Sequence, residues 1–135
     1  MTFVLDASAV LRLTDRDAGF ERVRDLFDGA ADGNFTLLIS AINWGEVFGV
    51  LARRYGAMRA REITDGLVGL PWMIVDVSAA DAEQAGTFKA SFKIPYADAF
   101  AATLAMKHSA TLVTADYDFQ TLPRGTVRVE FLSQK

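Results

Sequence analysis

The sequence predicts an α/β protein in which helices cover both faces of a mostly parallel sheet. Short, continuously apolar segments with strand character alternate with longer segments that carry apolar residues at helical spacing. Strands that are apolar throughout are typical of a parallel sheet, because both of their faces are buried. No repeat, low-complexity stretch or linker interrupts this alternation, so we expect a single domain over residues 1–135.

The expected strands and helices follow one another in regular order. The strands are short apolar runs over residues 2–5, 35–40, 72–77, 111–114 and 127–131. The helices show apolar residues at helical spacing or lie between cap and stop signals, over residues 9–13, 18–31, 42–55, 57–70, 79–92 and 96–108. This order of elements indicates strand–helix–strand units, which build parallel sheets.

A few residues mark where helices begin and end. Ser40 and Ser78 are suited to cap the helices that follow them, because a serine hydroxyl accepts a hydrogen bond from a first-turn amide. Gly56 is a typical C-terminal stop, and Pro71 ends the helix before it. A turn is expected over residues 116–119, where two aspartates favour turn formation.

The composition limits the kinds of function that this chain can have. Its 135 residues are 51% hydrophobic and 23% charged, carry a net charge of −3 and include no cysteine. The protein is therefore expected to be globular, without disulfides or thiolate metal sites. If it binds nucleic acid, a cation, a basic patch or a basic partner must offset its acidic balance. No signal-peptide pattern or membrane-length apolar run is present, so we expect a cytoplasmic protein without membrane association.

Two aspartates come at the ends of predicted strands. Asp6 directly follows the first strand, and Asp116 follows the strand over residues 111–114 after one intervening residue. Functional sites of parallel sheets lie beyond the carboxyl ends of the strands, which favours a role for both acids. Each also has an ordinary interpretation. Asp6 can be a helix N-cap, a role equally open to Ser8, and Asp116 can be a turn residue beside Asp118.

Two further acids lie in the first two turns of helices whose N-termini face the same edge. Asp98 is followed by the small residues Ala101 and Ala102, which leave space for an ion and its waters. The helix dipole also favours an acid at that position. Glu46 stands outside the broad apolar stripe of its helix, where a solvent-facing glutamate would be equally ordinary.

Taken together, these four acids indicate a metal site. Two carboxylates about 4 Å apart repel each other by roughly 4 kcal/mol at an effective dielectric constant near 20, so a cluster of acids is costly without a cation. Ligand sets made only of oxygen select hard ions such as Mg²⁺ or Mn²⁺, which also accept phosphate oxygens. The acids therefore favour metal-assisted phosphodiester hydrolysis.

Other catalytic patterns are absent from the sequence. There is no P-loop, no dinucleotide-binding glycine fingerprint and no G-x-S-x-G elbow. The only histidine, His108, lies near a helix end, where a cation suits the helix dipole. Histidine-based catalysis and zinc binding are therefore disfavoured, and any chemistry falls to the carboxylates.

These motifs resemble the PIN-domain ribonucleases, most closely the compact VapC-type toxins of bacterial toxin–antitoxin pairs. The matching segments lie in the family's order over essentially the whole chain: D-x-S at residues 6–8, the glutamate of SAINWGEV at Glu46, the aspartate of ADAFAATLA at Asp98, and T-x-D-x-D-F at residues 114–119. The resemblance implies a three-layer α/β/α sandwich. It also implies a toxin endoribonuclease that uses Mg²⁺ or Mn²⁺ to activate water against an RNA phosphate.

The resemblance also implies roles for individual residues. The carboxylates that it implies as catalytic share one pocket: Asp6, Glu46, Asp98 and Asp116. Three of them are implied as metal ligands: Asp6, Asp98 and Asp116. Glu46 would bind a second metal or orient the attacking water. Ser8 and Thr114 would hold the carboxylates in place, whereas Asp118 is equally well explained as a turn residue.

The partners implied by the resemblance are an RNA substrate, transfer RNA by family analogy, and a cognate antitoxin protein. The toxin would form a homodimer and a toxin–antitoxin hetero-oligomer. Five aromatic residues would either form a groove for a partner helix or simply pack the helices of the sheet: Phe20, Phe27, Trp44, Phe48 and Tyr55. Six basic residues are candidates for phosphate contacts without being assigned to a site: Arg12, Arg16, Arg53, Arg54, Lys89 and Lys93.

Three other interpretations stay open from the sequence. One is a degenerate PIN domain that binds RNA or protein without cleavage, although a scaffold has little reason to keep four mutually repelling acids. A second is a metal-dependent phosphoesterase that acts on DNA, although the chain offers no obvious duplex-binding module. A third, more distant one is a phosphorylatable receiver domain, whose paired N-terminal acids and late lysine are not evident.

Overall fold

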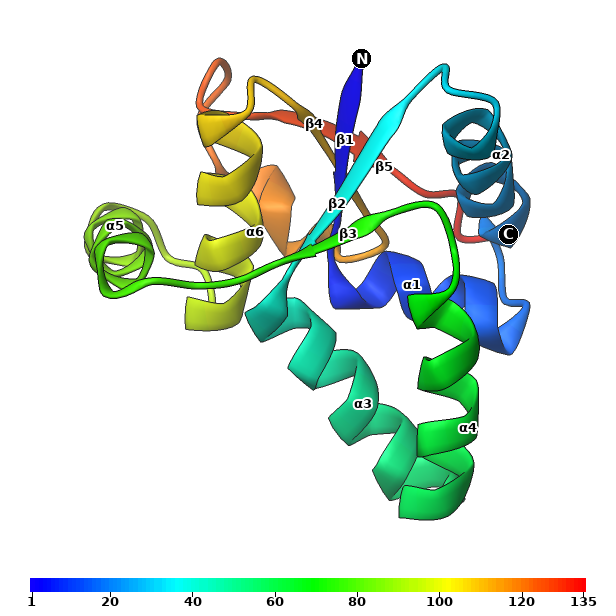
Figure 1. Ribbon diagram of the computed structural model, residues 1–135. Coiled ribbons are helices and arrows are strands. Elements are labelled where there is room, and N and C mark those ends of the chain that lie inside the picture. Colours follow the sequence, from blue (N-terminus) through cyan, green and yellow to red (C-terminus); the bar gives the residue numbers. More distant parts are fainter.

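A five-stranded parallel sheet forms the centre of the computed structural model, which describes residues 1–135 (Figure 1). Its strands are β1 (Thr2–Leu5), β2 (Thr36–Ser40), β3 (Met73–Val75), β4 (Thr111–Thr114) and β5 (Arg128–Phe131). They lie in the order β3-β2-β1-β4-β5, and in the central strand Val4 is paired with Leu38 on one side and Leu112 on the other. Because every pairing is parallel, the carboxyl ends of all strands meet at one edge.

Six α-helices connect the strands and cover the sheet. Their bounds are α1 (Ala7–Asp15), α2 (Phe20–Ala31), α3 (Ala41–Tyr55), α4 (Ala57–Val68), α5 (Ala79–Ser91) and α6 (Tyr96–Lys107). Figure 1 shows α5 and α6 on one side of the sheet, α1 and α2 on the other, and α3 and α4 as a pair that extends past the carboxyl edge. None of these helices combines the length and apolar character needed to span a membrane.

Alternate residues of the central strand face two separate hydrophobic cores. Phe3 and Leu5 belong to a core shared with α1, α2, α3 and α4, whereas Val4 belongs to a core shared with α5 and α6. All three side chains are at most 3% exposed. Burial on both faces explains why the strand is apolar throughout. The predicted three-layer α/β/α sandwich with a parallel sheet is confirmed.

Every predicted strand and helix is present, and the predicted and observed bounds agree to within about two residues. The first helix begins at Ala7 rather than Ala9, because Asp6 is its N-cap. The predicted role of Ser8 as an alternative cap is wrong, since Ser8 lies inside this helix. The third strand is limited to Met73–Val75, and the expected turn after Asp116 is the short 3₁₀ helix η1 (Tyr117–Thr121).

Most of the aromatic residues considered for a partner groove pack inside the protein. Phe27 is buried and meets Trp72 edge-on at 5.1 Å between ring centroids, and Trp72 meets Trp44 in the same way at 5.7 Å. Phe48 packs against the same core, whereas Tyr55 is 50% exposed. The packing interpretation therefore holds for three of the five aromatic residues, and Tyr55 belongs to the surface.

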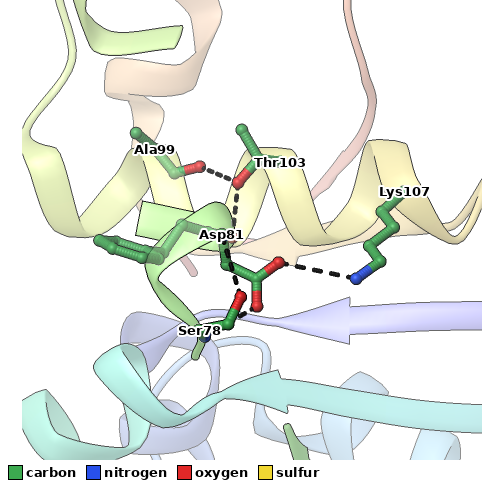
Figure 2. A network of polar contacts seen from close by, with 6 residues as sticks. Ser78, Asp81, Ala99, Thr103 and Lys107 are labelled. Atoms are coloured by element: carbon green, nitrogen blue, oxygen red, sulfur yellow. Dashed lines mark hydrogen bonds and ion pairs between the residues drawn. The ribbon is translucent and has the colours of Figure 1, made fainter. Parts of the chain in front are cut away.

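Polar contacts fasten α6 to α5 on the second face of the sheet (Figure 2). Ser78 and Asp81 form a reciprocal capping box at the start of α5, and the Asp81 carboxylate lies 3.6 Å from the Lys107 ammonium group at the end of α6. The Thr103 hydroxyl donates to the Ala99 carbonyl within α6. The ion pair joins α5 to α6, and the buried alanine side of α6 packs this helix against the sheet.

Candidate active site

Four acidic residues lie beyond the carboxyl edge of the sheet. Asp6 follows β1 directly, and Asp116 follows β4 after one residue. Glu46 lies in the second turn of α3, and Asp98 lies in the first turn of α6. In Figure 1 the N-terminal ends of α1, α3 and α6 lie together below this edge. Segments that are distant in the sequence thus bring all four acids to one region.

Asp6 is almost completely buried and is engaged by several hydrogen-bond donors. Its side chain is 3% exposed, and Oδ1 accepts from the Ser8 hydroxyl at 2.7 Å and from the Ala9 amide at 3.0 Å. Oδ2 accepts a short hydrogen bond from the Thr114 hydroxyl. Burial raises the pKa of Asp6 to about 6, although these three hydrogen bonds lower it. Asp6 is thus both an N-cap and a buried acid of the site, so the two interpretations of this residue are compatible.

Two hydroxyl groups join the segment after β1 to the segment after β4. The Thr114 hydroxyl, fully buried, accepts from the Asp116 amide at 2.9 Å while it donates to Asp6. The Ser8 hydroxyl accepts from the Ala115 amide at 2.9 Å and lies 3.2 Å from the Thr114 hydroxyl. The orientation of the Asp6 carboxylate is therefore set by Ser8 and Thr114 together.

We expect Thr114→Val to lower the free energy of unfolding by about 1–3 kcal/mol, because the buried Asp6 carboxylate and Asp116 amide each lose a partner. Urea denaturation measures this loss. Thr103→Val is the matched control, since its hydroxyl bonds only to backbone carbonyls of its own helix and such bonds add little stability. Equal losses in the two variants would contradict a special role for the Thr114 hydroxyl.

Asp98 is the most strongly perturbed acid of the group. Its Oδ2 atom is buried and has no hydrogen-bond partner. Burial, the charges of Asp116 and Asp6, hydrogen bonding with Asp116 and the charge of Glu46 together raise the pKa of Asp98 to about 7. The other three predicted site acids therefore lie within electrostatic reach of Asp98.

Glu46 is exposed, and its carboxylate is held by a residue that the sequence analysis did not single out. The side-chain amide of Asn43 donates to Glu46 Oε1 at 2.9 Å and to the Ala97 carbonyl at 3.2 Å. Asn43 is completely buried on the face of α3 that carries Val47. In the sequence, Asn43 could have been recognised as a polar residue on the apolar side of this helix, where a buried amide needs a hydrogen-bond partner.

The donor set of the site suits a hard divalent cation, although the carboxylates are not gathered into a ready ligand cage. No group of three or more histidine, cysteine, aspartate or glutamate side chains is spaced to hold an ion. Mg²⁺ is commonly bound by one or two carboxylates and keeps several waters, so it does not require such a cage. The buried Oδ2 atom of Asp98, beside Asp116, has no hydrogen-bond partner and is therefore free to bind a cation.

The surroundings of the site include both basic and acidic side chains. A groove of ≈ 620 Å³ beside Asp116 is lined by Ser8, Arg12, Asp15, Arg54 and Asp116, among others. The Arg54 guanidinium is paired with Asp15 across this groove. Asp118 is exposed, and its backbone amide donates to Asp116 Oδ1 at 2.9 Å, as in a turn. Lys89 and Lys93 line a different groove, next to Pro95.

Comparison with known proteins identifies the family. Residues 3–125 match the sequence profile of the PIN domain. The chain therefore belongs to the PIN-domain family, as its motifs predicted. A comparison with curated proteins gave no significant match.

Solved structures with the same fold include several toxins of the VapC type. One is VapBC2 from Rickettsia felis bound to a DNA fragment from its promoter, with 21% identity, a TM-score of 0.74, and 98% of this chain and 100% of that chain covered. Another is DNA-bound VapBC from Salmonella typhimurium, with 17% identity, a TM-score of 0.75, and 97% and 98% covered. A third is VapC20 from Mycobacterium tuberculosis, a sarcin-ricin loop cleaving toxin, with 20% identity, a TM-score of 0.70, and 87% and 92% covered. At these identities the similarity establishes the fold.

Proposed function

We propose that this chain is a metal-dependent endoribonuclease and the toxin of a toxin–antitoxin pair, acting as one domain over residues 1–135. The observation that carries the proposal is the buried, unpartnered Oδ2 atom of Asp98 among the charges of Asp116, Asp6 and Glu46. Membership of the PIN-domain family and the shared fold with VapC toxins, one of which cleaves the sarcin-ricin loop, support it.

In this proposal Asp98 and Asp116 would hold Mg²⁺ or Mn²⁺, and Asp6 would contribute as a third ligand. When bound, the ion lowers the pKa of water and stabilises negative charge on the phosphate. Ser8 and Thr114 keep the Asp6 carboxylate in one orientation, so that little reorganisation accompanies ion binding.

Glu46 has a different place from the other three acids. Its carboxylate is exposed and its charge acts on Asp98, so it would contribute to ion binding and orient the water that attacks the phosphate. The groove lined by Arg12 and Arg54 offers guanidinium groups for the phosphates of RNA next to Asp116. We further propose transfer RNA as a substrate to test first, and a homodimer whose pocket a cognate antitoxin covers.

The proposal is tested by cleavage of total transfer RNA and ribosomal RNA on denaturing gels, with Mg²⁺, with Mn²⁺ and with EDTA. We expect discrete products with either metal, no products in EDTA, and recovery when metal is added back in excess. Cleavage that persists in EDTA would contradict metal dependence. The same reactions with single-stranded DNA separate a ribonuclease from a phosphoesterase that acts on DNA.

A non-cleaving RNA- or protein-binding module is the second candidate, and the lack of a ready three-carboxylate cage favours it. It predicts RNA binding that is unchanged by Mn²⁺ or EDTA, with no products at any enzyme concentration. Gel-shift titrations run beside the cleavage reactions distinguish the two candidates.

A further inference from the structure

Asn43 is a polar residue in an otherwise apolar position. It lies in the first turn of α3, on the same buried face as Val47 and Leu51, and all three side chains are 0% exposed. An amide buried among apolar side chains is costly unless it is hydrogen-bonded. The burial of the Asn43 amide is therefore tolerated only because of the hydrogen bonds that it makes.

Both amide hydrogens of Asn43 are used, and they join two helices. Nδ2 donates to Oε1 of Glu46 on α3 at 2.9 Å and to the carbonyl oxygen of Ala97 on α6 at 3.2 Å. Ala97 directly precedes Asp98. One side chain thus connects the carboxylate of Glu46 to the backbone that carries the Asp98 carboxylate.

The orientation of the Asn43 amide is determined by the two hydrogen bonds that its NH₂ group donates. Asn43 Oδ1 is buried without a partner, and the other buried side-chain atom in this condition is Oδ2 of Asp98. Turning the amide over would place its oxygen against the Glu46 carboxylate and the Ala97 carbonyl, which are both acceptors. The amide is therefore locked in the orientation that serves Glu46.

We propose that Asn43 is a positioning residue that fixes the Glu46 carboxylate relative to Asp98. A glutamate side chain in solvent samples many rotamers, and Asn43 is the one hydrogen-bond donor that Glu46 has in the structure. Because the same amide is bonded to Ala97 on α6, these two bonds resist a shift of α3 relative to α6 and so keep the two acids in a fixed relation. The inference rests on the proposed function, since it assigns the pair to one metal-binding site.

Asn43→Ala is expected to weaken Mn²⁺ binding by about tenfold, the lower end of what loss of a supporting hydrogen bond costs a metal site. Isothermal titration calorimetry on the purified protein measures the Kd without depending on cleavage. Val47→Ala is the matched control, because it opens a cavity on the same buried face but leaves the hydrogen bond from Asn43 to Glu46 in place. We expect Val47→Ala to lower the melting temperature while its Kd for Mn²⁺ stays within about twofold of wild type.

A double-mutant cycle separates positioning of Glu46 from a general effect on α6. If Asn43 acts through Glu46, the Asn43→Ala change should alter the Kd by less than about twofold in a Glu46→Ala background. An equal loss in both backgrounds would overturn the inference, as would a Val47→Ala loss as large as that of Asn43→Ala.

Asn43→Asp provides a second variant of nearly the same shape in case the alanine variant does not fold. It replaces the donor with an acceptor that faces Glu46, so we expect it to weaken Mn²⁺ binding at least as much as Asn43→Ala. Most of that loss should disappear in the Glu46→Ala background, and a loss that stays undiminished there overturns the inference. If wild type itself binds no Mn²⁺, the proposed function fails and the inference fails with it. If wild type binds Mn²⁺ but the effects of the Asn43 and Glu46 substitutions on the Kd are additive, the inference about Asn43 fails while the proposed function stands.

Discussion

Asp98→Asn is expected to abolish RNA cleavage and, at neutral pH, to raise the stability of the protein. The loss of activity should be about 10³-fold or more, because a ligand to a catalytic metal contributes several kcal/mol and each 1.36 kcal/mol is tenfold in rate. The gain in stability follows from the charges. Burial and the neighbouring acids raise the pKa of Asp98 to about 7, so its ionised form is disfavoured in the folded protein.

An amide at position 98 has nearly the same shape as the carboxylate but no charge. Its nitrogen can also donate to the neighbouring Asp116 carboxylate, which removes part of the mutual repulsion. Most substitutions destabilise a protein, so a substitution of Asp98 that removes activity and raises stability is a specific signature of an acid held for function.

Single-turnover cleavage and urea denaturation at about pH 7.5 measure the two effects. The matched control is Asp118→Asn, the same chemical change at an exposed acid close to the site, which should leave both activity and stability near wild type. Cleavage by Asp98→Asn at the wild-type rate, with folding verified by circular dichroism, would exclude Asp98 from the catalytic site. A lower stability of this variant would contradict the electrostatic argument.

The stability of the metal-free protein is expected to fall as the pH rises from about 4 to about 7 through the titration of Asp6 and Asp98. Both pKa values lie above the ordinary value of 3.8 in the folded state, so the folded protein binds more protons than the unfolded chain within this range. Stability therefore declines with rising pH, and the stabilising effect of these protons is gone above about pH 7.

For Asp6, a change in pKa from 3.8 to about 6 corresponds to about 3 kcal/mol, at 1.36 kcal/mol for each pKa unit. Asp98 adds less than its higher pKa suggests, because solvent reaches part of this side chain and screens its charge. Other acids also titrate in this range, so the informative quantity is the difference between Asp98→Asn and wild type. That difference should grow as the pH rises from about 5 to about 8.

Mn²⁺ should reverse this trend. A cation that binds only the folded protein stabilises it by about 2.7 kcal/mol at a concentration 100 times its Kd. Because it competes with protons for the carboxylates, the increase in melting temperature should be larger at about pH 8 than at about pH 5. Differential scanning fluorimetry across this range, with and without Mn²⁺, measures the effect. A stabilisation by Mn²⁺ that is independent of pH would argue that the ion binds elsewhere.

The order of elements and the edge where the acids gather could be predicted from local patterns in the sequence. Strands buried on both faces are apolar throughout, as in residues 2–5, and caps such as Ser40 act through their immediate neighbours. The parallel order of such strands places Asp6 and Asp116 at one edge regardless of the details of packing. These features depend on short-range physics, which is why the fold prediction was accurate.

Some features of the site depend on contacts between distant segments. Nothing local distinguishes the Asp6 carboxylate as a cap from the same carboxylate as a buried acid, and the Thr114 hydroxyl that completes its environment lies 108 residues away. The bond from Asn43 to Ala97 spans 54 residues, so no helical or strand pattern reveals it. The charges around Asp98 likewise come from separate elements.

The sequence by itself determined the fold class, the acids and the edge at which they meet, because periodicity and capping depend on neighbouring residues. Only the tertiary structure decided which acid is buried without a partner, which hydroxyls hold Asp6, and which amide holds Glu46. Burial and electrostatic coupling depend on the distances between side chains of segments that folding brings together, and local sequence patterns do not specify these distances.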